Sequence, residues 1–236
     1  KLKKMGDFVP QCHTHVFTQL NRCTFCGTGK GKVPQPRIYA VLLCRNEREM
    51  ILVMDLRDYQ KSLILSVAKE FKAGKRAICC VLGCGGGKSV IQGTIAANAN
   101  RKGNRVLFLV HRKELCEQIR NTFTVCGVDW TLTDVGMVQT ITRHIDELPK
   151  PDVIITDECH LSTAKTYTRI YDAFPDALRL GFTATPCRLG AGGLGSVYDS
   201  LIQGVSTRWL IDNHFLADYK HYSVPLANTS DLHSRN

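Results

Sequence analysis

The stretch AICCVLGCGGGKSV, from Ala77 to Val90, decides the fold of this sequence. It opens with an apolar run, which predicts a buried strand at 77–82. Glycines follow, and a helical pattern then begins at Lys88 and continues to about Asn100. A strand, a glycine-rich loop and a helix in this order form a phosphate-binding unit. The sequence therefore predicts a P-loop domain.

Each residue type in the loop suits a nucleotide. Backbone N–H groups of Gly85–Gly87 can curl around phosphate oxygens, and the positive end of the following helix supports them. The Lys88 ammonium would face the phosphates and the Ser89 hydroxyl a Mg²⁺ ion. The strict motif requires glycine where Leu82 stands. A loop that only makes a tight turn would nevertheless leave the Lys-Ser pair unexplained, so we predict ATP and Mg²⁺ as cofactors.

Two adjacent carboxylates follow a second apolar run, DVIITDECH, at residues 152–160. In nucleotide hydrolysis the first acid can hold Mg²⁺, and the second can orient or deprotonate the attacking water. An isolated acidic pair after a strand is more often a helix cap. Downstream of a phosphate loop, the pair predicts that Asp157 and Glu158 are catalytic together with Lys88.

Alternating strand and helix patterns surround these motifs. A helix is expected at 58–71, and further strands at 105–110, 136–138, 152–156 and 178–183, with helices between several of them. This alternation is typical of an α/β domain with a central, mostly parallel sheet. The catalytic candidates then fall at the carboxyl ends of strands, where open α/β sheets bind ligands.

Six blocks occur in the order found in superfamily 2, DEAD/DEAH-like helicases: LRDYQ, GCGGGKS, VLFLVHRKEL, VGMVQT, DECH and GFTATP. The chain resembles the first RecA-like domain of that superfamily over residues 55–222. The family's loop tolerates an apolar residue at the position of Leu82, whereas Cys84 stands where threonine is frequent. The later segments FTATPCRLGAGGLGSVYDSLIQG and LIDNHFLADYKHYSVP resemble the RadD-like or restriction-type groups of bacterial and phage helicases.

The resemblance implies roles for further residues. Gln60 would read the adenine edge, with Arg57 nearby. Thr183 and Thr185 would couple the nucleotide site to strand movement through hydrogen bonds to the DECH segment, and His160 would link the γ-phosphate site to a partner domain. The residues that would contact a nucleic-acid backbone are His111, Arg112, Lys113, Gln139 and Thr140. We expect this partner to be DNA rather than RNA, and its binding to be largely independent of sequence.

The family pattern continues into a second RecA-like domain that carries an arginine finger, and no such motif is visible before Asn236. We expect residues 223–236 to begin the connection to that domain. Because an arginine finger contributes roughly 10³- to 10⁵-fold in rate, the chain is expected to bind ATP and hydrolyse it poorly.

A cysteine and histidine cluster precedes the motor blocks. Cys12, His15, Cys23 and Cys26 have the spacing of a tetrahedral structural Zn²⁺ site, and His13 could replace His15. We expect a zinc-knuckle or zinc-ribbon module at 1–35 and a linker at 36–54. Free thiols in a disordered tail are the alternative.

Composition narrows the class of protein. The chain has 236 residues, 44% of them hydrophobic, and a net charge of +10. Nine Lys or Arg against three Asp or Glu within residues 1–53 suit a polyanionic partner or a solvated basic tail. With no apolar membrane span or signal core, we expect a protein of the cytoplasm of a bacterial or phage-infected cell. Apolar runs such as AICCVLG indicate that many of the eleven cysteines are reduced.

Two other functions share these motifs. A remodelling or packaging ATPase would move polypeptide or duplex without unwinding it, although LRDYQ and GFTATP argue against this. A nucleic-acid-binding module with a vestigial ATP site would depend on zinc and basic residues alone.

Overall fold

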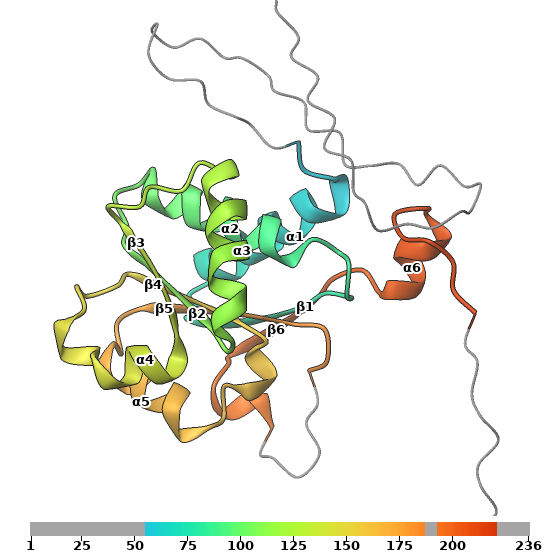
Figure 1. Ribbon diagram of the computed structural model, residues 1–236. Coiled ribbons are helices and arrows are strands. Elements are labelled where there is room, and N and C mark those ends of the chain that lie inside the picture. Colours follow the sequence, from blue (N-terminus) through green and yellow to red (C-terminus); the bar gives the residue numbers. More distant parts are fainter. Residues whose placement is uncertain (1–54, 187–192, 221–236) are drawn as a thin grey trace, which may run out of the picture. The chain divides into compact units, whose positions relative to one another are not determined.

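The computed structural model describes residues 55–186 and 193–220 (Figure 1). Their helices and strands, in chain order, are α1 Asp58–Lys72, β1 Ala77–Val81, α2 Lys88–Asn100, β2 Val106–Val110, α3 Lys113–Val125, β3 Thr133–Met137, α4 Val138–Arg143, β4 Val153–Asp157, α5 Lys165–Ala173, β5 Leu178–Thr183, β6 Ser200–Gln203 and α6 Thr207–Asp212. Three short 3₁₀ helices are η1 Ile145–Glu147, η2 Cys159–Leu161 and η3 Leu194–Ser196.

The strands form one six-stranded sheet in the order β3-β2-β4-β5-β1-β6, and every neighbouring pair is parallel. The predicted α/β class and parallel sheet are confirmed. Parallel strands that are covered on both faces read as continuous apolar runs, as β1 and β2 do. All five residues of each of these two strands are buried.

Helices cover both faces of the sheet. Residues of α1, α2 and α3 pack with Ile78 and Cys80 of β1 on one face. Residues of α4 and α5 pack with Cys79 and Val81 of the same strand on the other, as Figure 1 shows for the helices. Alternate residues of a buried strand thus reach opposite layers of the core.

The register aligns the strand ends that carry the predicted motifs. Val81 of β1 lies opposite Thr183 of β5, and Asp157 of β4 lies opposite Phe182 of β5. The phosphate loop, the acidic pair and the TAT segment, which is Thr183–Thr185, therefore leave the same edge of the sheet.

Two expectations need correction. The strand expected at 136–138 spans Thr133–Met137, and Val138 already begins α4. The elements β6 and α6 were not expected, because four and six residues are too few to show a clear period.

Within 55–186 and 193–220, no helix is long and apolar enough to cross a bilayer. The same part of the chain contains no group of three or more His, Cys, Asp or Glu that could hold a metal ion. The expected zinc ligands Cys12, His15, Cys23 and Cys26, the linker at 36–54 and the segment 223–236 lie outside the described residues.

Candidate functional site

The loop between β1 and α2 has a backbone that requires glycine. Gly85 and Gly87 have φ values of 77° and 78°, in the left-handed region that favours glycine. A side chain at Gly87 would meet the Gln60 Nε2 atom, and a Cβ at Gly83 would lie 2.7 Å from the backbone nitrogen of Thr207. The loop is therefore a close-fitting backbone cradle at the N-terminus of α2.

Lys88 and Ser89 open α2 directly after this cradle. The first N–H groups of a helix have no partner within the helix, so they are free for a ligand. The Lys88 ammonium makes no ion pair or hydrogen bond with the part of the chain that the structure describes. Donors and a positive charge therefore converge at one helix end.

The acidic pair lies at the end of β4 and in the turn that follows it. Asp157 is the last residue of the strand, and Glu158 adopts φ 48° and ψ 51°. A left-handed conformation is uncommon for a residue with a side chain. Glu158 Oε2 lies 3.3 Å from His160 Nδ1. The turn thus directs the two carboxylates differently, since Asp157 contacts Gln92 and Glu158 contacts His160.

Hydrogen bonds join the TAT segment to the DECH turn. His160 Nδ1 lies 3.0 Å from Thr183 Oγ1. Thr183 Oγ1 also accepts from the Thr185 backbone N–H and donates to the Thr185 carbonyl, each at 3.1 Å. The structure therefore contains a hydroxyl contact between the two segments of the kind that we expected.

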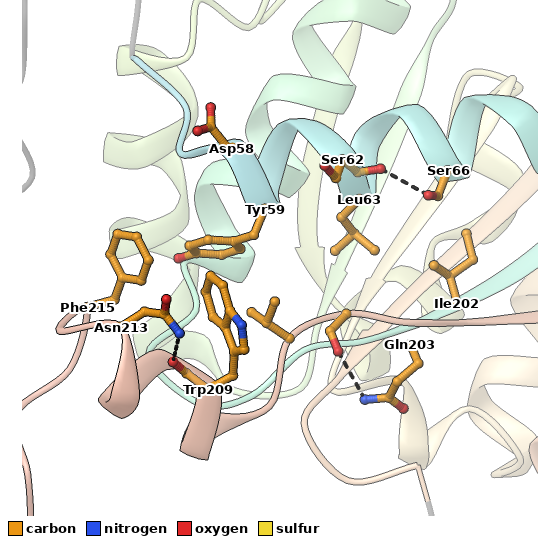
Figure 2. A pocket seen from close by; sticks show the side chains of 12 residues that line it. Asp58, Tyr59, Ser62, Leu63, Ser66, Ile202, Gln203, Trp209, Asn213 and Phe215 are labelled. Atoms are coloured by element: carbon orange, nitrogen blue, oxygen red, sulfur yellow. Dashed lines mark hydrogen bonds between the residues drawn. The ribbon is translucent and has the colours of Figure 1, made fainter.

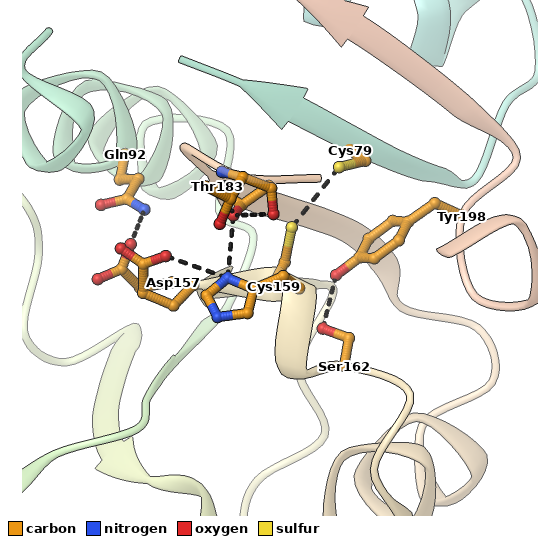
Figure 3. Close-up of polar contacts among 10 residues, drawn as sticks. Cys79, Gln92, Asp157, Cys159, Ser162, Thr183 and Tyr198 are labelled. Atoms are coloured by element: carbon orange, nitrogen blue, oxygen red, sulfur yellow. Dashed lines mark hydrogen bonds and ion pairs between the residues drawn. The ribbon is translucent and has the colours of Figure 1, made fainter. Parts of the chain in front are cut away.

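A hydrogen bond from Gln92 joins α2 to the acidic pair, and the sequence motifs did not predict a role for this residue. The fully buried side chain donates from Nε2 to Asp157 Oδ1 at 3.1 Å (Figure 3). Lys88 and Gln92 are spaced i, i+4, so they lie on one face of α2. A polar residue at this spacing from the loop lysine is the signal that could have identified Gln92.

The N-terminus of α1 contacts the same loop. The buried Gln60 side chain accepts from the Arg57 backbone N–H at 2.9 Å and donates to the Gly86 carbonyl at 3.3 Å. The Tyr59 hydroxyl also donates to the Gly86 carbonyl, at 3.1 Å. The predicted adenine-reading residue is therefore also a structural link between α1 and the phosphate loop.

Aromatic side chains from the α6 region surround the start of α1. The Arg57 guanidinium carbon lies 4.7 Å from the centre of the Phe215 ring, and Trp209 stacks on Phe215. Tyr59 meets both rings edge-on. A cavity of about 630 Å³ continues from these rings between α1 and β6, as Figure 2 shows.

Buried thiols lie behind the acidic turn. The sulfur atoms of Cys79 and Cys159 are 3.6 Å apart, and both residues are free cysteines. The hydrogen bond with Cys79 and burial raise the pKa of the Cys159 thiol, and burial likewise raises the pKa of the Cys80 thiol. For these residues the expectation of buried cysteine is confirmed.

The candidates for nucleic-acid contact follow two neighbouring strands. His111 and Arg112 are exposed after β2, and Lys113 begins α3. Gln139 and Thr140 are exposed in the first turn of α4, directly after β3. Since β2 and β3 are adjacent and parallel, the two groups leave the same edge of the sheet.

Residues 53–140 and 131–188 match the family described as type III restriction enzyme, res subunit. The chain belongs to this family. Membership confirms the resemblance to restriction-type superfamily 2 helicases, and the parallel sheet fits a RecA-like domain. The region of the match includes the phosphate loop, the acidic pair and the TAT segment.

Two individual proteins are similar to this chain in sequence. The chain is 46% identical over 152 residues to a 51.5 kDa protein of a Lactococcus phage, covering 64% of this chain and 34% of that protein. It is 30% identical over 210 residues to the putative ATP-dependent helicase IRC3 of Saccharomyces cerevisiae, covering 76% of this chain and 30% of that protein. The chain thus spans about a third of the length of these relatives.

A solved structure shares the fold. The ATP-dependent type ISP restriction-modification enzyme LlaBIII bound to DNA aligns with a TM-score of 0.57 and 19% identity, over 71% of this chain and 16% of that one. At this identity the likeness concerns the fold alone.

Proposed function

We propose that residues 55–222 are the ATP-binding half of a DNA helicase or translocase, which hydrolyses the β–γ bond of ATP. The hydrogen bond from Gln92 to Asp157 carries this proposal, because it joins the helix that begins with Lys88 to the strand that ends at the acidic pair. One site can therefore hold a triphosphate and its metal ion.

The residues present fit ATP with Mg²⁺. The glycine cradle and the Lys88 ammonium offer donors to phosphate oxygens. Ser89 and Asp157 offer the oxygen ligands that Mg²⁺ prefers, directly or through water. Glu158 then orients and deprotonates the attacking water. Bound Mg²⁺ would supply charge neutralisation on the phosphates.

Arg57 and Gln60 are proposed to bind the base. Two hydrogen bonds leave the Gln60 carboxamide with one N–H and one lone pair, which is what a purine edge with a neighbouring donor and acceptor needs. Phe215 and Tyr59 both contact the Arg57 guanidinium, so its plane is held beside Gln60. A planar cation of this kind suits stacking on a base.

Nucleic-acid contact is assigned to five residues at the carboxyl end of β2 and β3, which are His111, Arg112, Lys113, Gln139 and Thr140. Contacts to the phosphate backbone carry no direct sequence information. Membership of the res-subunit family favours DNA as the partner. A second RecA-like domain would supply the arginine finger, and His160, Thr183 and Thr185 would transmit its closure.

Lys88→Ala tests the nucleotide site. Because a charge-assisted contact to phosphate is lost, ATP affinity should fall about 10- to 100-fold, as measured by equilibrium titration. Lys102→Ala removes an exposed lysine from the turn after α2 and should change nothing. Unchanged affinity in Lys88→Ala would refute the assignment.

Hydrolysis assays separate the related functions. ATP hydrolysis that single-stranded DNA stimulates would favour the translocase. A hydrolysis rate that is the same with and without nucleic acid would favour a remodelling or packaging ATPase. ATP binding that is absent in the unaltered chain would favour a nucleic-acid-binding module with a vestigial site.

We also propose that Cys12, His15, Cys23 and Cys26 bind structural Zn²⁺. Their spacing supports this proposal. Elemental mass spectrometry of the purified chain should find about one Zn²⁺ per molecule. Cys23→Ser should lose the metal, whereas Cys84→Ser, at an exposed position of the phosphate loop, should retain it. A metal-free chain after purification without chelators would contradict the proposal.

A further inference from the structure

Gln92 is a buried amide at the junction of α2 and β4. Its side chain is 0% exposed, and its Nε2 atom donates to Asp157 Oδ1 at 3.1 Å. Asp157 itself is only partly buried, so its carboxylate lies between the protein interior and the open edge of the sheet. The hydrogen bond therefore fixes a carboxylate that solvent or a ligand can reach.

The other end of the amide has no partner within residues 55–186 and 193–220. Gln92 Oε1 is buried and receives no hydrogen bond from the residues that the structure describes. Native proteins leave few buried polar atoms unsatisfied, and each exception calls for a reason. Because Nε2 must face the carboxylate to donate, the orientation of the amide is set. The Oε1 atom then remains an acceptor with no donor among the described residues.

A hydrated divalent cation offers such donors. Water molecules on Mg²⁺ present only O–H groups to their surroundings, and Mg²⁺ usually keeps several of them in proteins. Negatively charged phosphate oxygens, by contrast, would be repelled by Oε1. An acceptor beside a carboxylate therefore matches the outer side of a metal site better than the phosphate cradle.

We propose that Gln92 is a positioning residue of the metal site. Its Nε2 group holds one oxygen of Asp157, which leaves the other oxygen for Mg²⁺ or its water. Its buried Oε1 atom would accept from a metal-bound water after a side-chain rearrangement that exposes it. This proposal rests on the proposed ATP site and adds a residue from the middle of α2. Gln92 acts on magnesium affinity and does not take part in the chemical step.

The test compares magnesium-dependent with magnesium-independent binding of ADP. Gln92→Met keeps the length of the side chain and removes both hydrogen-bonding groups. Residues that orient a metal ligand typically contribute 10- to 100-fold in metal affinity, so the MgCl₂ concentration for half-maximal tightening of ADP binding should rise by about that factor. ADP affinity in EDTA should stay within about twofold.

Thr94→Val is the matched control. Thr94 is a partly buried residue of the same helix, and its hydroxyl donates to the Val90 carbonyl, away from the acidic pair. This variant should keep the magnesium requirement of the unaltered chain. Gln92→Asn, whose amide is too short to reach Asp157 from the same backbone position, should behave like Gln92→Met and serves if that variant fails to fold.

The outcomes are distinguishable. An unchanged magnesium requirement in Gln92→Met or Gln92→Asn overturns the inference and leaves the proposed function standing. Parallel losses in EDTA and in MgCl₂, together with a lower melting temperature, show a packing role and also overturn it. If the unaltered chain binds no ADP under any condition, the proposed function itself fails.

Discussion

Gly93 lies where α2 packs against α3. A Cβ atom at this position would lie 2.9 Å from Cys126 Sγ and 3.0 Å from Phe123 Cδ1. Phe123 belongs to the core layer that covers one face of the sheet, and Cys126 is buried at the end of α3. The absence of a side chain at Gly93 thus permits the close approach that orients α2, and with it the phosphate loop and Gln92.

Gly93→Val should destabilise the protein by about 1 to 3 kcal/mol, because extra atoms in a packed interior force neighbouring groups to shift. Urea denaturation measures the change. Gly195→Ala is the control, since a Cβ there would meet none of the described residues within 4 Å, and its effect should stay within about 0.5 kcal/mol. Equal effects of the two substitutions would contradict the packing argument.

Four hydroxyl groups tie together elements behind the acidic turn. Tyr171 of α5 lies 2.9 Å from Thr156 of β4 and 3.1 Å from Ser162, and Ser162 lies 3.0 Å from the Tyr198 hydroxyl. Figure 3 shows the contact between Ser162 and Tyr198 beside Cys159. Burial raises the pKa of both tyrosines, so they remain protonated donors at neutral pH. The network thereby anchors the backbone that carries Glu158.

Tyr171→Phe should cost about 1 to 3 kcal/mol of unfolding free energy, because two buried hydroxyls lose a partner. Tyr198→Phe should cost less, about 1 kcal/mol, since Ser162 keeps its bond to Tyr171. Chemical denaturation of the two variants measures which of them loses more unfolding free energy. A larger effect of Tyr198→Phe would show that the network is organised differently.

The net charge of the whole molecule would influence its affinity for DNA. The net charge of +10 favours a polyanion, and binding through phosphates releases counterions. The proposed contacts lie at the carboxyl edge of the sheet, as does the proposed nucleotide site. One edge would therefore serve both ligands, which is what coupling of hydrolysis to movement along a strand requires.

DNA affinity should fall steeply as salt concentration rises, and Arg112→Ala should reduce the slope of log affinity against log salt by about one. Lys102 lies in the turn before β2, whereas Arg112 follows the other end of that strand. Lys102→Ala should therefore leave the slope unchanged. Fluorescence anisotropy at several salt concentrations measures both. Equal slopes in all proteins would exclude Arg112 as a phosphate contact.

Local patterns in the sequence determined the parallel α/β sheet, the phosphate loop, the acidic pair and the family. The apolar strand, the glycines and Lys88 occur within a few consecutive residues, so a local pattern suffices to predict them. The helix α2 has the predicted bounds. The end of β3 was misplaced because Val138 suits either a strand or the first turn of a helix.

Only the tertiary structure decided which side chains meet. Gln92 and Asp157 are 65 positions apart, Cys79 and Cys159 are 80 apart, and Phe215 reaches Arg57 from the far end of the described chain. No periodicity reports such pairs, because a period records which face of an element is buried and not which side chain it contacts. The order and register of the parallel strands supply part of that information, because they set which strand ends lie side by side.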